Sequence, residues 1–187
     1  MDRAEAVRKL VPVFRQYGYE GATLARISQA TGLGRASLYH HFPDGKKEMA
    51  NAVLEHIKFV VQAQVLDPLL KSGDPLERLQ TMTDQLNQFY DRGQSACFLA
   101  IFSLGESDSL FHPHIQQALQ AWINALESVL LELDLPDAIA QQRAEDAVMQ
   151  IQGALVVSRG LQETSLFQRV LEQLPKRLAA PSPETVA

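Results

Sequence analysis

A glycine that separates two short apolar repeats, near the start of this 187-residue chain, constrains its fold more than any other feature. Thr23 is one of the residue types that cap a helix through a side-chain oxygen. Leu24, Ile27 and Ala30 follow it at helical spacing. Gly32 then suits the left-handed conformation in which helices commonly end. These residues predict a short helix that opens after Thr23 and stops at Gly32.

A second short helix is predicted to begin near Arg35. Leu38 and Phe42 lie four residues apart and so share its buried side, while Leu33 closes the corner between the two helices. Two helices joined by a short turn that contains glycine form a helix-turn-helix, whose second helix enters the major groove of DNA. The side chains expected on its outward face are those of Arg35, Ser37, Tyr39 and His40.

The motifs around this segment match one known family. An aromatic-x-x-x-Gly-aromatic run ends the first helix at Phe14–Tyr19, and ISQATGLG follows at residues 27–34. LYHHF comes next at residues 38–42, and Lys46 opens a fourth helix. With these motifs, the segment resembles the DNA-binding region of the TetR family of transcriptional repressors. The Phe42–Lys46 connection is one residue longer than the family's commonest form, and in this it resembles the LmrA/YxaF-like branch.

Three features depart from the family pattern. Ser28 and Thr31 stand where the family usually has alanine, which slightly enlarges two packed positions. Gly34 replaces the usual serine cap of the recognition helix, a change worth about a few tenths of a kcal/mol. Pro12 lies inside the first helix, where it removes an N–H and crowds the preceding turn, so a kink or a weak start is expected. None of these changes removes a candidate DNA contact.

The distribution of charge favours a DNA-contacting N-terminal part. Residues 1–50 contain eight Lys/Arg and five Asp/Glu, a net charge of +3, whereas the whole chain carries −5 and residues 51–187 therefore carry −8. A local basic face is sufficient for phosphate contacts in a chain that is acidic overall. The outward face and the family resemblance together predict these DNA contacts: Thr23, Arg26, Arg35, Ala36, Ser37, Tyr39, His40 and Lys46.

The rest of the chain has helical periodicity, with no strand pattern and no internal repeat. The predicted fold is all-α, with about nine helices. It comprises a three-helix DNA-binding head at residues 1–48, an effector-binding and dimerisation domain at 49–178, and a disordered, Pro-rich tail at 179–187. The predicted helices of the larger domain run from Lys46 toward Leu66, from Pro75 to near Gly93, from Cys97 to Leu104, from Pro113 after a loop at 105–109, from Asp137 to Gly160, and from there through Leu174.

The family resemblance implies an effector pocket and a dimer interface in the larger domain. Few polar side chains lie among the candidate pocket residues, which predicts a largely apolar or aromatic effector. The candidate pocket residues are Met82, Phe89, Phe98, Phe102, Phe111, Trp122 and Met149. The dimer interface is predicted in a four-helix bundle, two helices from each chain, with Ala147, Val148, Ile151, Ala154, Leu155, Phe167, Val170, Leu171 and Leu174.

Other chemistries find little support in the residues. A metal site near His112 and His114 would need a spaced ligand set that the sequence lacks, so no metal and no cofactor are predicted. Cys97 has apolar flanks and no basic neighbour, which predicts an inert core thiol, and one cysteine leaves no intrachain disulfide. The start of the chain lacks the apolar core of a signal peptide, and no apolar run is long enough to span a membrane, so a cytoplasmic setting is expected.

The sequence therefore predicts a homodimeric transcriptional repressor that binds a palindromic DNA operator and is released by a small hydrophobic effector. The main alternative is a helical ligand- or metal-sensing protein without sequence-specific DNA binding. An enzyme is the third choice, because no paired carboxylates, no nucleophile with its base and no phosphate-binding loop are found.

Overall fold

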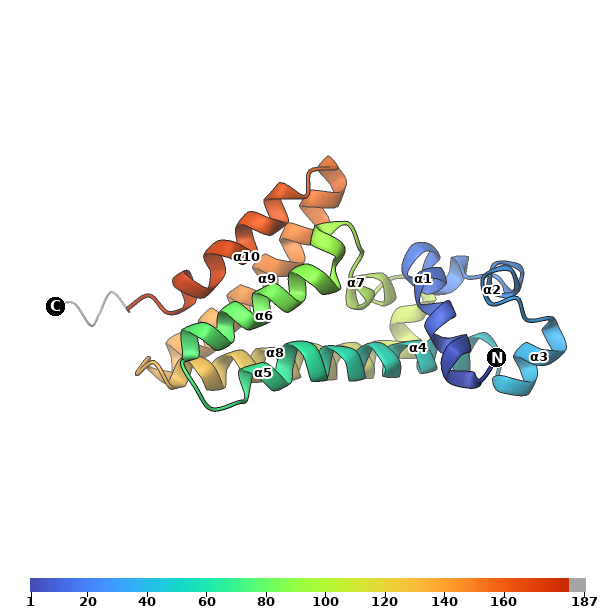
Figure 1. Ribbon diagram of the computed structural model, residues 1–187, viewed down its shortest axis with the longest axis horizontal. Helices are drawn as coiled ribbons and strands as arrows, with labels where there is room; N and C mark the ends of the chain where they lie inside the picture. The colour runs from blue at the N-terminus through green and yellow to red at the C-terminus, as the bar shows by residue number, and fades with distance from the viewer. Residues whose placement is uncertain (182–187) are drawn as a thin grey trace. The chain divides into compact units, whose positions relative to one another are not determined.

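The computed structural model describes residues 1–181, which contain helices and no strand. The predicted all-α fold class is thus confirmed (Figure 1). The helices are α1 (Arg3–Gly21), α2 (Leu24–Thr31), α3 (Arg35–His41), α4 (Lys46–Val61), α5 (Asp67–Leu69), α6 (Pro75–Phe89), α7 (Phe98–Phe102), α8 (Glu106–Leu131), α9 (Asp137–Leu161) and α10 (Ser165–Leu178), with a π-helical turn η1 (Gln62–Leu66) and a 3-10 turn η2 (Asp91–Gly93).

The short helix α5 continues α4 without a break in the helical path. A π-helical turn at Gln62–Leu66 joins them, and Pro68 stands near the start of α5. Proline has no N–H to donate within a helix, and π-helical bonding, which is rare, occurs mostly as single turns inside α-helices. When α4 and α5 are counted as one helix, residues 1–181 contain nine, as the sequence predicted.

The chain divides into two compact units, each discontinuous in sequence. The head unit consists of Met1–Phe59 and Ala96–Gln116, and the body unit of Val60–Ser95 and the chain from Gln117 onward. The head unit therefore extends beyond the predicted residues 1–48 and includes α7 and the first turns of α8. No helix among residues 1–181 is long and apolar enough to cross a membrane.

Aromatic side chains form the centre of the head unit. Phe14 of α1, Phe102 of α7 and Phe111 of α8 are each fully buried. Their rings form a chain, because Phe102 lies 6.1 Å from Phe14 and 5.1 Å from Phe111, measured between ring centroids. Burial of a phenylalanine side chain contributes about 1.5–3 kcal/mol. These contacts fasten α7 and the start of α8 onto the helix that precedes the helix-turn-helix.

The break in α1 lies at Gly18 rather than at Pro12. Gly18 has φ 67° and ψ −175°, a region that is essentially restricted to glycine. An added Cβ at Gly18 would also lie 3.5 Å from the Ile101 side chain. Pro12 is tolerated inside α1, so the kink expected there is displaced to the glycine of the aromatic-glycine motif.

The body unit is built around α6, α9 and α10, and Figure 1 shows α10 alongside both other helices. Asp74 caps α6 by accepting a hydrogen bond from the Leu76 N–H at 2.7 Å, and Pro75 occupies its first position, as the sequence predicted. The apolar face of α10 includes Phe167, which is fully buried. The opposite face of α10 is polar, so this helix is strongly amphipathic.

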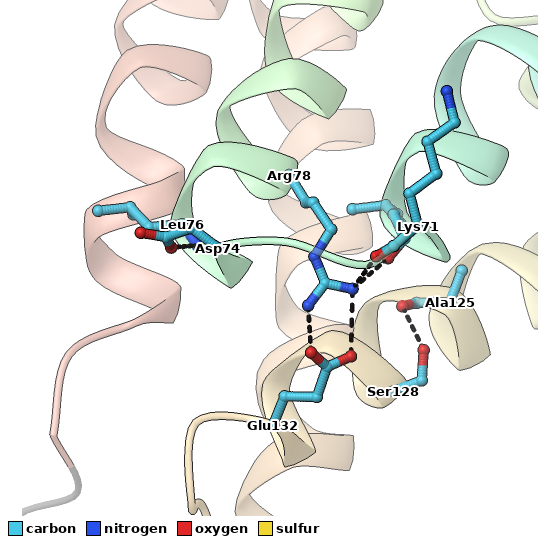
Figure 2. Close-up of polar contacts among 8 residues, drawn as sticks. Lys71, Asp74, Leu76, Arg78, Ala125, Ser128 and Glu132 are labelled. Carbon is cyan, nitrogen blue, oxygen red and sulfur yellow. Dashed lines mark hydrogen bonds and ion pairs between the residues drawn. The ribbon is translucent and has the colours of Figure 1, made fainter.

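A buried arginine joins three segments of the body unit (Figure 2). The guanidinium of Arg78 donates to the carbonyl oxygens of Leu69 at 2.9 Å and Lys71 at 2.7 Å, and it forms an ion pair with both carboxylate oxygens of Glu132. Arg78 is 7% exposed, whereas the Glu132 side chain is 51% exposed. Arg78 thereby satisfies carbonyl groups at the end of α5 that no helical N–H can reach.

The predicted loop at 105–109 and the helix start at Pro113 are wrong. α8 begins at Glu106, and Pro113 lies inside it. The composition of this stretch suggested a loop, but the helix start is capped from a distant part of the head unit, because Glu20 accepts a hydrogen bond from the Ser107 N–H at 3.1 Å. Gly105 precedes the helix with φ 62°. A cap 87 residues away in sequence leaves no local signal.

The C-terminal helices also differ from expectation in detail. α9 continues past Gly160, and Gln162 is the residue that adopts the left-handed cap with φ 56°. The predicted tail at 179–187 lies outside the described residues from position 182 onward. Before that point the Arg143 guanidinium donates to the carbonyl oxygen of Leu178 at 2.8 Å and also to that of Ala180, which holds the chain beyond α10.

Candidate nucleic-acid interface

The helix-turn-helix is formed by α2, the turn at 32–34 and α3. Thr23 caps α2 by accepting a hydrogen bond from the Arg26 N–H at 3.4 Å, and Gly32 adopts the left-handed conformation with φ 72°. Gly34 is the N-cap of α3 and makes no side-chain cap bond. Ile27 of α2 and Leu38 of α3 are fully buried. Each of these features was predicted from the sequence.

The outward face of α3 presents the expected side chains to solvent. The buried positions are Leu38 within the helix and Phe42 at its end, both fully buried. Ala30 of α2, which was expected on the inner face, is exposed, and Thr31 is buried in its place with its hydroxyl bonded to the Ile27 carbonyl at 2.8 Å. The exposed residues of α3 are Arg35, Ala36, Ser37, Tyr39 and His40.

Two of these side chains form a row toward the start of α4. The Arg35 guanidinium lies 5.8 Å from the centroid of the Tyr39 ring, one helical turn further on. The Tyr39 ring lies against Gly45, where an added Cβ would be 3.3 Å from a ring carbon. Gly45 has φ 66° and is buried, so glycine is required there by its conformation and by the ring.

Arg26 is engaged within the head unit, although it is exposed. Its guanidinium donates to the Gly21 carbonyl at 2.7 Å and lies 4.1 Å from the centroid of the Tyr17 ring. Thr23 is likewise exposed but uses its hydroxyl as the α2 cap. A contact between Arg26 and DNA would therefore compete with an existing hydrogen bond, unlike one made by Arg35.

Residues that the sequence did not single out hold α3 and α4 in place. Arg3 forms an ion pair with Glu48 at 3.1 Å and donates to the His41 carbonyl at 3.3 Å. Its guanidinium also lies 5.0 Å from the centroid of the Phe42 ring. The second carboxylate oxygen of Glu48 accepts a hydrogen bond from the Asp44 N–H at 3.0 Å. Charges at the start of α1 thus tie down the end of α3, a pairing too distant in sequence for periodicity to reveal.

Lys46 stands at the first position of α4, next to the recognition helix. Its ammonium group lies 4.4 Å from the centroid of the Tyr19 ring. Helix N-termini carry partial positive charge, so a lysine here adds to a field that attracts phosphate. Arg35, Tyr39 and Lys46 belong to adjoining elements, and the α3–α4 corner therefore combines exposed polar groups with positive charge.

This head has the arrangement of known bacterial regulators, and sequence models of two families match the chain. The model of bacterial regulatory proteins of the tetR family matches residues 10–53. The model of the C-terminal domain of LmrA/YxaF-like transcriptional regulators matches residues 75–173, more than half of the chain. The chain belongs to the TetR family. It is a transcriptional regulator that binds DNA through a helix-turn-helix, and it belongs to the LmrA/YxaF-like branch, as the sequence motifs indicated.

Named relatives and solved structures agree with this assignment to the TetR family. The chain is 22% identical over 170 residues to the HTH-type transcriptional regulator LmrA of Bacillus subtilis, covering 89% of this chain and 90% of that protein. It is 22% identical over 167 residues to the uncharacterized regulator YxaF of the same organism, covering 87% of both. A TetR regulator from Legionella pneumophila has the same fold, with a TM-score of 0.79 at 18% identity, covering 92% of this chain and 95% of that one.

The predicted pocket residues of this TetR-family chain are divided between the two units. Phe98, Phe102 and Phe111 lie in the aromatic core of the head unit, whereas Met82 and Trp122 are buried in the body unit. The other two are less enclosed: Phe89 is half-buried beside Tyr90, and Met149 is 60% exposed on α9. Met149 thus points away from the interior of its unit.

A cavity of about 160 Å³ lies between α9 and α10, and it contains none of the seven predicted pocket residues. It is partly open to solvent and has a mixed polar and apolar lining, with Arg143, Asp146, Gln150, Leu174, Arg177 and Leu178 around it. The histidines of α8 make ordinary pairs, His112 with Asp108 at 3.3 Å and His114 with Glu55 at 3.3 Å.

The residues predicted for the dimer interface are mostly buried inside the single chain. Ile151 is fully buried and Leu155 is 2% exposed. The full set with exposures of 5% or less is Ala147, Val148, Ile151, Leu155, Phe167, Leu171 and Leu174, and only Ala154 and Val170 are partly exposed. The dimer interface therefore stays a prediction, and α9 has a second apolar face besides the one recognised in the sequence, which packs within its own chain.

Proposed function

We propose that this TetR-family protein is a cytoplasmic repressor that binds a palindromic operator as a homodimer and is released by a small hydrophobic effector. The observation that carries the DNA-binding part is the exposed face of α3 beside Lys46 in a helix-turn-helix. In this motif the second helix lies in the major groove and the N-terminal residues of that helix contact base edges. Arg35, at the first position of α3, is therefore the residue best placed to contact a guanine edge.

The dimer interface is assigned to the second apolar face of α9. Met149 and Val156 are 60% and 63% exposed, although both are apolar and lie mid-helix. Gly153 and Gly160 belong to the same face, because residues 149, 153, 156 and 160 repeat at helical spacing. This face is opposite to Ile151, which is buried in the chain's own core.

The two glycines support a partner helix on this face. A glycine inside a helix is less favourable than alanine by about 1 kcal/mol. Nothing in the chain requires either glycine, because a Cβ added at Gly153 or Gly160 would meet no atom within 4 Å, and neither has a positive φ. A second copy of α9, crossing close to the backbone, would explain both positions. The exposed apolar surface would then be buried across a two-fold axis.

A two-fold dimer places two recognition helices on one face of the duplex. Half-sites of such proteins are separated by about 34–36 Å or a multiple of it. An effector that favours a body conformation with a different separation of the heads would lower operator affinity. Release therefore needs no direct contact between effector and DNA.

Trp122 supports an effector site in the body unit. The residue is 4% exposed, and its indole N–H has no hydrogen-bond partner among the described residues. A buried donor without a partner is unfavourable by about 1–3 kcal/mol. An apolar effector with one acceptor oxygen, such as a phenol or a ketone, would relieve this. Trp122 is also the single tryptophan of the chain, so its fluorescence would report binding directly.

The decisive experiment is an electrophoretic shift and footprint with the DNA upstream of the protein's own gene. We expect a protected, roughly palindromic site bound by two protomers, and competitor DNA of random sequence should not displace the protein at equal concentration. A protein that retards specific and random DNA alike would instead support the ligand-sensing alternative without operator recognition.

A further inference from the structure

The residues just after the Gly18 break lie against two other helices of the head unit. The ring of Tyr19 meets the Phe111 ring of α8 edge to face, with centroids 5.2 Å apart and planes 70° apart. The same Tyr19 ring lies 4.4 Å from the Lys46 ammonium at the start of α4. Glu20, the next residue, accepts the hydrogen bond from the Ser107 N–H at the start of α8. Tyr19 is thus held from the α8 side and contacts Lys46 with its ring.

The Tyr19 ring restricts where the Lys46 ammonium can be. A lysine side chain has four rotatable bonds, and ordering such a side chain on binding weakens affinity roughly two- to tenfold. An aromatic ring within about 6 Å attracts an ammonium group and narrows this freedom before DNA arrives. Lys46 is only half-buried, so its ammonium remains available to a phosphate.

We propose that Tyr19 is a positioning residue, which orders Lys46 for contact with an operator phosphate. This inference rests on the proposed operator binding. The non-helical residue Gly18 immediately precedes Tyr19, so the direction of the Tyr19 side chain is set by the break in α1 and not by a continuous helix. The positioning is also tied to α8 through Phe111, so the ordering of Lys46 depends on the first turns of that helix.

The test is a double-mutant cycle measured by fluorescence anisotropy with a labelled operator fragment at several salt concentrations. Tyr19→Leu removes the ring, Tyr19→Phe retains it, and each is made with Lys46 and with Lys46→Gln. In the Lys46 protein, Tyr19→Leu should weaken operator binding roughly two- to tenfold per head, and Tyr19→Phe should bind like the wild type. Lys46→Gln should reduce the salt slope by about 0.9 per head, and adding Tyr19→Leu to it should change nothing further.

Two outcomes would overturn the positioning role. If Tyr19→Leu lowers operator affinity equally in the Lys46 and the Lys46→Gln proteins, the ring only packs α1. If Tyr19→Leu binds the operator more tightly than the wild type, the ring withholds Lys46 from DNA. Tyr19→Met, which keeps bulk and flexibility without a π-face, replaces Tyr19→Leu if that variant does not fold. A wild-type protein that binds no operator would refute the proposed function instead, and the two failures are therefore distinguishable.

Discussion

Val156→Glu tests the proposed dimer through a residue that the single chain leaves exposed. Val156 is 63% exposed, and Met149, Val157 and Leu161 on the same helix are 60%, 50% and 65% exposed. Full burial of such a side chain contributes about 1.5–3 kcal/mol, so covering the exposed part of each contributes about 1–2 kcal/mol. Each side chain occurs twice at a two-fold interface. Losing the apolar contact of Val156 alone should therefore weaken the free energy of dimerisation by about 2–4 kcal/mol.

The introduced charge adds to this loss. Two glutamates near a two-fold axis repel each other, and burying each carboxylate without a partner is unfavourable by several kcal/mol. We therefore expect the dissociation constant of the dimer to rise at least about 100-fold, since each 1.4 kcal/mol corresponds to a factor of ten. Operator affinity should fall with it, while helicity and the thermal transition of the monomer should change little, because the site is solvent-exposed within one chain.

The assay is sedimentation or light scattering over a concentration series, with circular dichroism as the check on folding. Gln88→Glu, at an exposed position of α6, is the matched control for added charge and should leave the dimer intact. Ile151→Ala, at a fully buried position, should lower the free energy of unfolding by about 2–5 kcal/mol and leave assembly unchanged once folded. A wild type that is monomeric at micromolar concentration, or a Val156→Glu protein as dimeric as the wild type, would refute the assignment of this face.

Three further predictions concern operator contacts and stability. Arg35→Ala should weaken operator binding by about 1–3 kcal/mol per head and relax the preference at one base pair. Binding to a set of operator variants, each with one base changed, would measure this. A uniform loss of affinity at every base would count against base reading. Tyr39→Phe should weaken all operator variants alike, as loss of a phosphate hydrogen bond would, and unchanged affinity would exclude that contact. Arg78→Leu should lower the free energy of unfolding, measured in urea, by about 2–4 kcal/mol because two carbonyl groups lose their donor. Glu132→Gln, at a half-exposed position, should lower the same free energy by about 1 kcal/mol or less. Equal effects of the two variants would contradict this account.

The parts of the fold that the sequence predicted correctly rest on local signals. Thr23, Gly32, Asp74 and Pro75 act within one or two turns of the residues they organise, so their roles could be inferred from residue type and spacing. The start of α8 could not, because its cap comes from Glu20 in another helix. Tertiary contacts here outweighed a composition that is typical of loops.

The candidate site shows the same division between local and distant signals. The outward face of α3 followed from helical periodicity, whereas the contacts of Tyr19 with Lys46 and of Arg3 with Glu48 depend on how helices meet. Periodicity also located an apolar face of α9 but could not tell which of its two apolar faces the chain itself covers. Only burial distinguishes Ile151, which is buried, from Val156, which is exposed.

The discontinuous head unit has a consequence for synthesis on the ribosome. A nascent chain that has emerged only as far as Phe59 contains all of α1–α3 and most of α4 but lacks Phe102 and Phe111, the rings that complete its aromatic core. We expect such a chain to expose Phe14 and to remain incompletely folded until residues 96–116 follow. DNA-binding competence would therefore arise only after more than half of the protein has been made, and an isolated N-terminal fragment would be a poor substitute for the intact regulator.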